Sequence, residues 1–140
     1  MQNETVTYAD HPELPPPQGY RHSALSSGPL IHTAGQTWSS TETEDLANIG
    51  LREQVRGAVR SSVTALAGAG GSPDGIVSLD VFVVGLSQDT VDDVYRGIGR
   101  AAKEAGFGPV PITVLGVAAL AVPGALAEVR AIGVPMTGSA

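Results

Sequence analysis

The chain contains no cysteine, and this absence excludes a thiol nucleophile, a thiolate metal site and a disulfide framework. It also lacks an uninterrupted apolar segment long enough to cross a bilayer. The first residues, 1–4, have neither the basic start nor the apolar core of an export signal, so we expect a cytoplasmic protein without a membrane partner.

Basic residues are scarce as well. Eight Lys and Arg stand against 14 Asp and Glu, which gives a formal net charge of −6. This balance argues against nucleic acid as a partner, because its phosphates favour Lys and Arg. We therefore expect a small-molecule substrate, or a second copy of the chain, as the partner.

A length of 140 residues without an obvious break predicts a single domain. Residues 1–19 include the run HPELPPP at 11–17, and proline at this density prevents a helix or a central strand. We interpret residues 1–19 as an extended Pro-rich segment, residues 20–134 as the domain and residues 135–140 as a flexible tail.

The pattern of apolar residues predicts two helices and five strands. Strands are expected at 20–26 and 30–36, joined as a hairpin by the turn sequence Ser-Gly-Pro at 27–29. A polar loop at 37–44 precedes a helix from Leu51 to the Gly-Ala-Gly-Gly run at 68–71. A second helix is expected from a cap at Ser87 or Asp89 to Gly106. Buried strands are expected at 76–84, 112–120 and 126–134. This order predicts an α+β fold in which both helices stack on one face of a mixed sheet.

The last strand carries a lone carboxylate, Glu128, inside an apolar run. Alternation places Glu128, Arg130 and Ile132 on one face of this strand, and neither face of the preceding strand is polar. An unpaired buried acid is costly, so Glu128 must be paired, exposed at an edge or held ready to exchange a proton. Because two helices cannot cover both faces of the sheet, the remaining apolar face predicts self-association.

Five collinear segments together resemble the RidA/YjgF (Rid) family. They are GYRHS at 19–23, LIHTAGQ at 30–36, GIVSLDVF at 75–82, GVAAL at 116–120 and EVRAI at 128–132. The resemblance spans nearly all of residues 18–134. It implies a chorismate-mutase-like α+β subunit, a homotrimer whose sheets form a central barrel, and clefts between neighbouring subunits that bind small molecules.

Family members best known for their chemistry hydrolyse imines and enamines such as 2-aminoacrylate, which releases ammonia and a 2-keto acid. The resemblance maps the family's water-orienting or proton-carrying acid onto Glu128 and its cleft tyrosine onto Tyr20. The family's arginine, which grips the substrate carboxylate, is replaced here by Ile112, and a neutral side chain cannot pair with a carboxylate. The resemblance also implies substrate-binding backbone groups at three consecutive residues of the strand, Thr33, Ala34 and Gly35.

Several residues keep two interpretations. Glu128 is either the catalytic group or a structural carboxylate that pairs with Arg130 or bonds backbone amides at an interface. Arg130 is either that ion-pair partner or a substitute cation for substrate. Trp38 is either a lid over the cleft or an anchor for its loop. His22 and His32 would be diagonal neighbours if the first hairpin formed, either as proton carriers or as plain surface residues. No ligand spacing for a metal occurs and no cofactor is expected.

Three functions follow as hypotheses. The first is an enzyme acting on an imine, enamine or related keto substrate, in which Ile112 disfavours 2-aminoacrylate. The second is a tautomerase, cyclase or dehydratase of a biosynthetic pathway that uses the same cleft, with Glu128 moving a proton and no water added. The third is a trimer that binds ligands, or acts like a chaperone, without catalysis.

Overall fold

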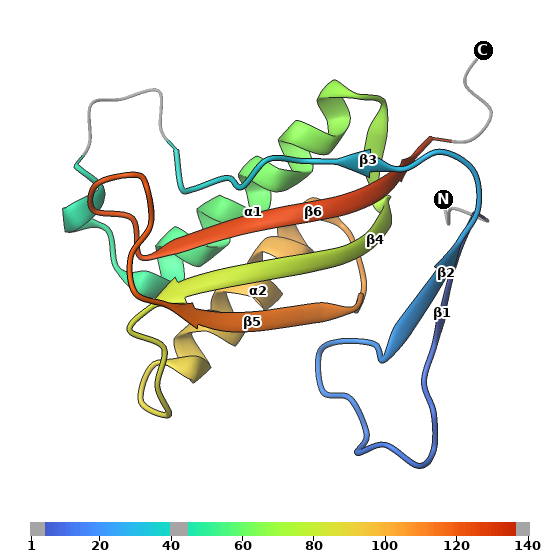
Figure 1. The fold of residues 1–140 in the computed structure, drawn as a ribbon, viewed down its shortest axis with the longest axis horizontal. Helices are drawn as coiled ribbons and strands as arrows, with labels where there is room; N and C mark the ends of the chain where they lie inside the picture. The colour runs from blue at the N-terminus through green and yellow to red at the C-terminus, as the bar shows by residue number, and fades with distance from the viewer. Residues whose placement is uncertain (1–4, 40–44, 137–140) are drawn as a thin grey trace.

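The computed structural model describes residues 5–39 and 45–136. The main sheet has four strands in the order β3-β6-β4-β5, with β3 at Ile31–His32, β4 at Gly71–Val84, β5 at Ile112–Val117 and β6 at Ala127–Pro135. Strand β5 runs parallel to β4, whereas β6 is antiparallel to both β3 and β4. Helices α1 (Leu51–Gly68) and α2 (Val91–Ala105) lie behind the sheet, and Figure 1 looks onto its open face. The predicted α+β fold with a mixed sheet and both helices on one face is confirmed.

The helices form where the sequence predicts them. Helix α1 ends before Ala69 and Gly70, and α2 ends at Gly106, whose φ of 86° is accessible to glycine without steric cost. The N-cap of α2 lies one residue after one of the expected caps, Asp89, and three after the other, Ser87. Thr90 occupies the N-cap position, because Ser87 is used in a turn in which its N–H donates to Thr90 Oγ1 at 2.9 Å.

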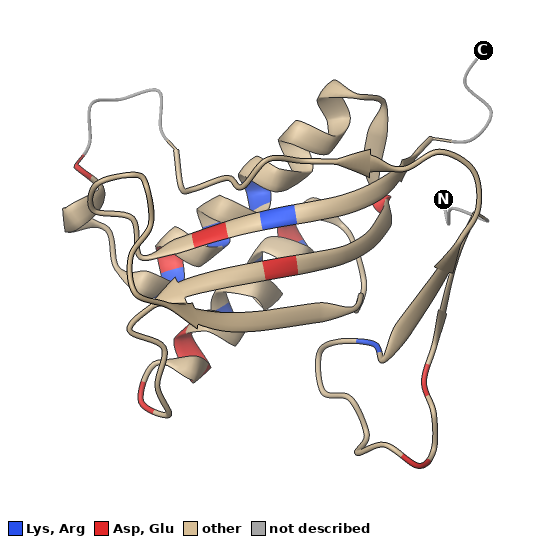
Figure 2. Cartoon of the chain, viewed as in Figure 1, with Lys and Arg blue, Asp and Glu red and all other residues tan. Residues whose placement is uncertain are grey.

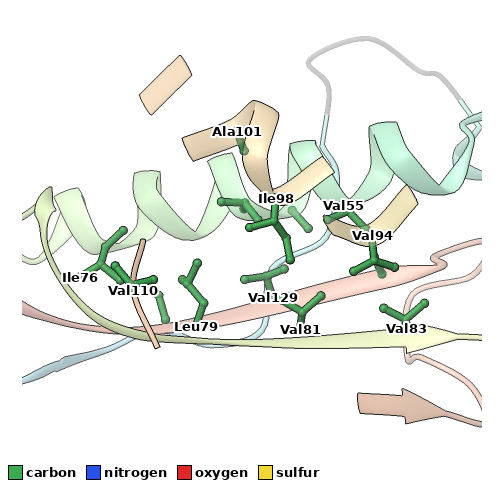
Figure 3. Packing of buried hydrophobic residues seen from close by; sticks show 14 of the residues in the cluster. Val55, Ile76, Leu79, Val81, Val83, Val94, Ile98, Ala101, Val110 and Val129 are labelled. Atoms are coloured by element: carbon green, nitrogen blue, oxygen red, sulfur yellow. The ribbon is translucent and has the colours of Figure 1, made fainter. Parts of the chain in front are cut away.

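One core lies between the helices and the sheet (Figure 3). From Leu79 to Val83 in β4 and from Ala127 to Ala131 in β6, every second residue points to the helices and is fully buried. Each branched side chain removed from water stabilises the fold by roughly 1.5–3 kcal/mol. The labelled members of this core are Val55, Ile76, Leu79, Val81, Val83, Val94, Ile98, Ala101, Val110 and Val129.

The predicted hairpin between 20–26 and 30–36 is wrong. Strand β2 (Ser23–Ser26) pairs instead with β1 (Val6–Ala9), and β3 pairs with β6. The β1–β2 hairpin projects beside the sheet (Figure 1) and is fixed to β4 by Tyr8, whose hydroxyl donates to the Ile76 carbonyl. Burial raises the pKa of the Tyr8 phenol, which keeps this donor protonated. The N-terminal segment therefore contributes a strand, β1, and β2 pairs with β1 and not with β3 as the sequence suggests.

Candidate functional site

Register divides the predicted site residues between the two faces of the sheet. Ile112 is opposite Leu79 on β4, and Leu79 is opposite Ala131 on β6; this row faces the helices. Glu128 is opposite Phe82, which in turn is opposite Leu115, and this row faces the open side. Within one chain, Glu128 and Ile112 therefore project from opposite faces of the sheet.

The open face carries one ion pair and one separate carboxylate. Figure 2 shows these charged positions in the middle of β4 and on β6, with a further acidic residue, Asp74, near the start of β4. Arg130 Nε donates to Asp80 Oδ2 at 3.0 Å, and its guanidinium lies 5.5 Å from the centre of the Phe82 ring. Glu128 and Arg130 therefore do not form the ion pair considered as one interpretation of the sequence. Among the described residues, Glu128 has neither an ion-pair nor a hydrogen-bond partner.

A bulge opposite β6 includes Gly35, which lies against the Glu128 side chain. Thr33 N donates to Ala131 O at 3.0 Å, and Gln36 N donates to Val129 O at 2.8 Å. Between these two bonds, Ala34 and Gly35 oppose a single β6 residue, which is the geometry of a β-bulge. No acceptor in the described part of the chain bonds the Ala34 or Gly35 N–H.

Thr33 has a structural contact as well. Its hydroxyl accepts a hydrogen bond from Ala131 N at 2.9 Å and so replaces the backbone carbonyl where regular pairing ends. The Ala34 carbonyl accepts from the Gln36 side chain at 3.4 Å, so the N–H groups of Ala34 and Gly35 are the bulge groups that bond no described acceptor. Sequence alone could not show this, because the bulge depends on the register between two segments nearly 100 residues apart.

Gly35 sets the position of the half-buried Glu128 side chain. A Cβ atom added at Gly35 would lie 2.6 Å from Glu128 Cδ, closer than real Cβ contacts come. The carboxylate thus rests directly against the Cα of Gly35, in a space that any larger residue would fill. This close approach gives a physical reason for glycine at a position whose φ is not in the left-handed region.

Tyr20 and Ile112 meet on the other side of the sheet. Both line a hollow of about 770 Å³ between α2, the loop 16–20 and the start of β5, which we call the α2 hollow. The main-chain bond from Arg21 N to Val110 O, at 3.1 Å, fixes the Tyr20 end of the loop to the chain that leads into β5. Glu128 does not line this hollow.

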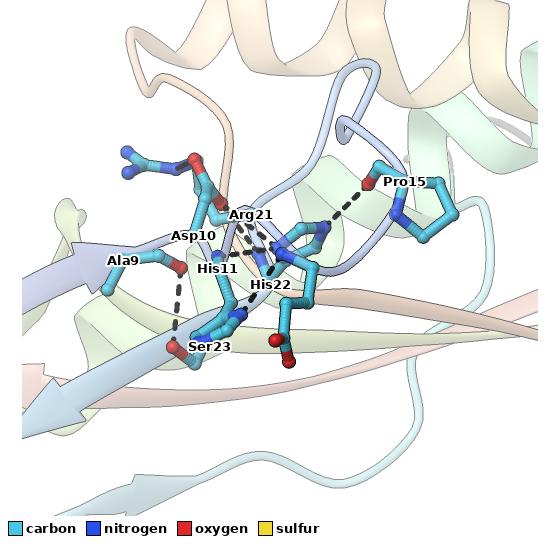
Figure 4. A network of polar contacts seen from close by, with 8 residues as sticks. Ala9, Asp10, His11, Pro15, Arg21, His22 and Ser23 are labelled. Atoms are coloured by element: carbon cyan, nitrogen blue, oxygen red, sulfur yellow. Dashed lines mark hydrogen bonds and ion pairs between the residues drawn. The ribbon is translucent and has the colours of Figure 1, made fainter.

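A polar network holds the loop that carries Tyr20 (Figure 4). His22 accepts at Nδ1 from His11 N at 3.0 Å, and its Nε2 donates to the Pro15 carbonyl at 2.9 Å. Asp10 accepts from His22 N and from Arg21 Nε, and these contacts, the His22 N–H first, lower the pKa of the Asp10 carboxyl. His22 is therefore a structural residue of this loop.

The expected neighbourhood of His22 and His32 is wrong, for the same reason as the expected hairpin. His22 precedes β2, which pairs with β1, whereas His32 lies in β3 beside Ile132 of β6. The described residues contain no group of three His, Cys, Asp or Glu side chains that could hold a metal ion.

Trp38 packs on α1. A Cβ atom added at Gly57 would lie 2.7 Å from Trp38 Cγ, so the indole lies directly against the glycine of the helix. This contact agrees with the interpretation of Trp38 as a loop anchor. The rest of the polar loop, residues 40–44, lies outside the described residues.

Substitution of Gly57 tests the position of Trp38. We expect Gly57→Ala to displace the indole, because the new methyl group occupies its place, while the helix gains roughly 0.5–1 kcal/mol in propensity. Trp38 is the only tryptophan, so its fluorescence reports this site alone. The expected result is a red-shifted, more easily quenched emission with little change in stability. Unchanged emission would show that the indole does not lie on Gly57.

Comparison with known proteins gives one family and many related structures. The family model described as endoribonuclease L-PSP matches residues 11–134. A Rid-family protein of unknown function, YyfB from Yersinia pestis, is 26% identical with a TM-score of 0.77, and the match covers 92% of this chain and 98% of that chain. Comparison with curated protein sequences gives no match.

Two Escherichia coli structures share the fold at lower identity. TdcF, solved with bound serine, is 19% identical with a TM-score of 0.65, covering 96% of this chain and 98% of TdcF. The YjgF gene product is 22% identical with a TM-score of 0.65, covering 82% and 87% of the two chains. In the described part of this chain, neither helix has the length and apolar character needed to span a membrane.

Proposed function

This chain belongs to the endoribonuclease L-PSP family, that of the Rid and YjgF proteins, and we propose that it acts on an imine, an enamine or a related keto substrate. The proposed site is a cleft between subunits of a homotrimer. Family membership supports the processing of a small molecule. The observation that carries the more specific proposal is the Glu128 carboxylate, which lies against Gly35 and has no ion-pair or hydrogen-bond partner among the described residues.

A cleft between subunits would bring together the two groups of proposed site residues, which lie on opposite sides of the sheet within one chain. Tyr20 and Ile112 lie on the helix side, whereas Glu128 lies on the open side, so one chain cannot present all three to one ligand. The open face also exposes apolar surface, including Leu115 at 48%. In the proposed trimer this surface is covered by a neighbour, and Glu128 of one subunit faces the α2 hollow of the next.

Glu128 is suited to activate water in such a cleft. As the water oxygen bonds to the C=N carbon, Glu128 accepts its proton and the imine nitrogen is protonated, which gives a carbinolamine. The C–N bond then breaks as the nitrogen takes a second proton, the hydroxyl loses its proton, and a keto product and ammonia leave. The N–H groups of Ala34 and Gly35 hold a substrate oxygen during these steps.

The α2 hollow determines which imines are accepted. Ile112 contributes an apolar wall instead of a positive charge, and a small acid such as 2-aminoacrylate leaves most of the hollow empty. We therefore propose a substrate with a larger, more apolar body. An added methylene that fills an apolar pocket contributes roughly tenfold or more to selectivity.

A series of imines tests this selectivity. Imino acids generated in situ from alanine, leucine and phenylalanine by an amino-acid oxidase would be followed by ammonia release, with 2-aminoacrylate as the smallest member. We expect acceleration by the protein to rise with side-chain size, by about tenfold or more across the series. Highest activity on 2-aminoacrylate would refute the size preference. No acceleration of any member would refute the hydrolase and favour the tautomerase or binding alternatives.

A further inference from the structure

The α2 hollow concentrates the aromatic residues of the chain. Three of its six aromatic side chains line it, namely Tyr20, Tyr95 and Phe107, together with the aliphatic Ile98 and Ile112. Tyr95 is 42% exposed, so its ring is accessible to a ligand in the hollow. A concave, mainly apolar surface of this size is typical of a small-molecule site.

The charged side chains of the hollow differ in whether they are already paired. Only Asp92 and Lys103 among its described lining residues carry charge. Asp92 accepts from Arg96 Nε at 2.6 Å, so its charge is compensated within α2. Lys103, in the last turn of α2, has no ion pair or hydrogen bond to any described residue. The hollow therefore combines apolar walls with one uncompensated ammonium group.

We propose that the α2 hollow binds a small carboxylate with an aromatic or branched apolar body, and that Lys103 pairs with the carboxylate. The apolar body fits the aromatic walls, and the charge at the rim fixes the direction in which the ligand enters. A lysine suits this role because its flexible stem carries a point charge that three donors surround. This proposal rests on the proposed function, since the hollow forms one wall of the same cleft.

Arg100 provides a matched control on the same helix. Its guanidinium, like the Lys103 ammonium, forms no ion pair with another described residue. It lines the groove between α1 and α2, which Lys103 also borders, but unlike Lys103 it does not line the α2 hollow. Neutralising Arg100 changes the net charge of the protein by the same amount without altering the hollow. General electrostatic effects are thereby separated from a specific contact.

Binding of three simple probes to the full-length protein tests the proposal. 3-Phenylpropanoate has both the ring and the carboxylate, 3-phenylpropanamide has the ring without the charge, and propanoate has the charge without the ring. We expect calorimetry to show that 3-phenylpropanoate binds about fivefold more tightly than either of the others. Lys103→Met should equalise the acid and the amide, whereas Lys103→Arg and Arg100→Met should retain the difference.

The outcomes separate this proposal from the proposed function. Equal binding of acid and amide to the unmodified protein, or a preference that survives Lys103→Met, would overturn the role of Lys103. A preference lost equally in Arg100→Met would show a general charge effect and would also overturn it. Because binding of these unreactive probes does not need Glu128, the role of Lys103 can fail while catalysis stands, and the reverse also holds.

Discussion

Replacement of Glu128 by glutamine is expected to lower kcat/KM for an accepted imine by a factor of about 10² to 10⁴, while the melting temperature and the mass of the assembly stay unchanged. Glutamine keeps the size of the side chain and so fits against Gly35, but it cannot take a proton from water. Because Glu128 has no ion-pair or hydrogen-bond partner among the described residues, its neutralisation leaves no buried charge unpaired. Steady-state kinetics, thermal unfolding and light scattering measure the three quantities.

Two further variants make this result interpretable. Glu13→Gln makes the same chemical change in the N-terminal loop, where the Glu13 side chain forms no bond to a described residue, and full activity is expected. Gly35→Ala leaves Glu128 in place chemically but pushes its carboxylate away, so activity should fall with little loss of stability. If Glu128→Gln instead breaks the assembly or lowers its melting temperature, the carboxylate is structural and the catalytic proposal is wrong.

The sequence predicts the elements whose pattern is local. Alternation along β6 correctly places Glu128 and Arg130 on one face of the sheet. Successive side chains of any strand point to opposite faces, whatever strands lie beside it. The pairing of strands is different, since it depends on which distant segment lies alongside. Strand β2 takes Val6–Ala9 as its partner, although the nearby turn at 27–29 suggests β3.

In the candidate site, too, the sequence predicts the local features but not those that depend on strand pairing. The pattern of the last strand is enough to identify Glu128 as the acid of the site. It does not show that Glu128 lacks an ion-pair partner, because Arg130 pairs instead with Asp80, 50 residues away, through the register of β4 and β6. The contact between Gly35 and Glu128 likewise depends on a bulge formed by two distant segments. Sequence thus identifies the candidate groups, and register decides which of them meet.

The second large effect is expected at the contact between the helices. At Gly97 on α2, an added Cβ atom would lie 2.6 Å from the Arg52 carbonyl oxygen and 2.9 Å from Val55 Cβ on α1. Both atoms are held in place by the backbone of α1, so Gly97→Ala must push the helices apart and loosen the core between them. We expect a loss of about 2 kcal/mol in the free energy of unfolding, even after alanine's better helix propensity is counted.

Gly99 offers the control two residues along the same helix. It is exposed, and an added Cβ atom there meets no atom within 4 Å, so Gly99→Ala should raise stability by up to about 1 kcal/mol through helix propensity. Urea unfolding at one fixed protein concentration compares the two variants, because self-association would otherwise contribute. Equal effects of the two substitutions would mean that α1 and α2 do not approach closely at Gly97. Opposite signs would show that helix contact, and not propensity, requires glycine there.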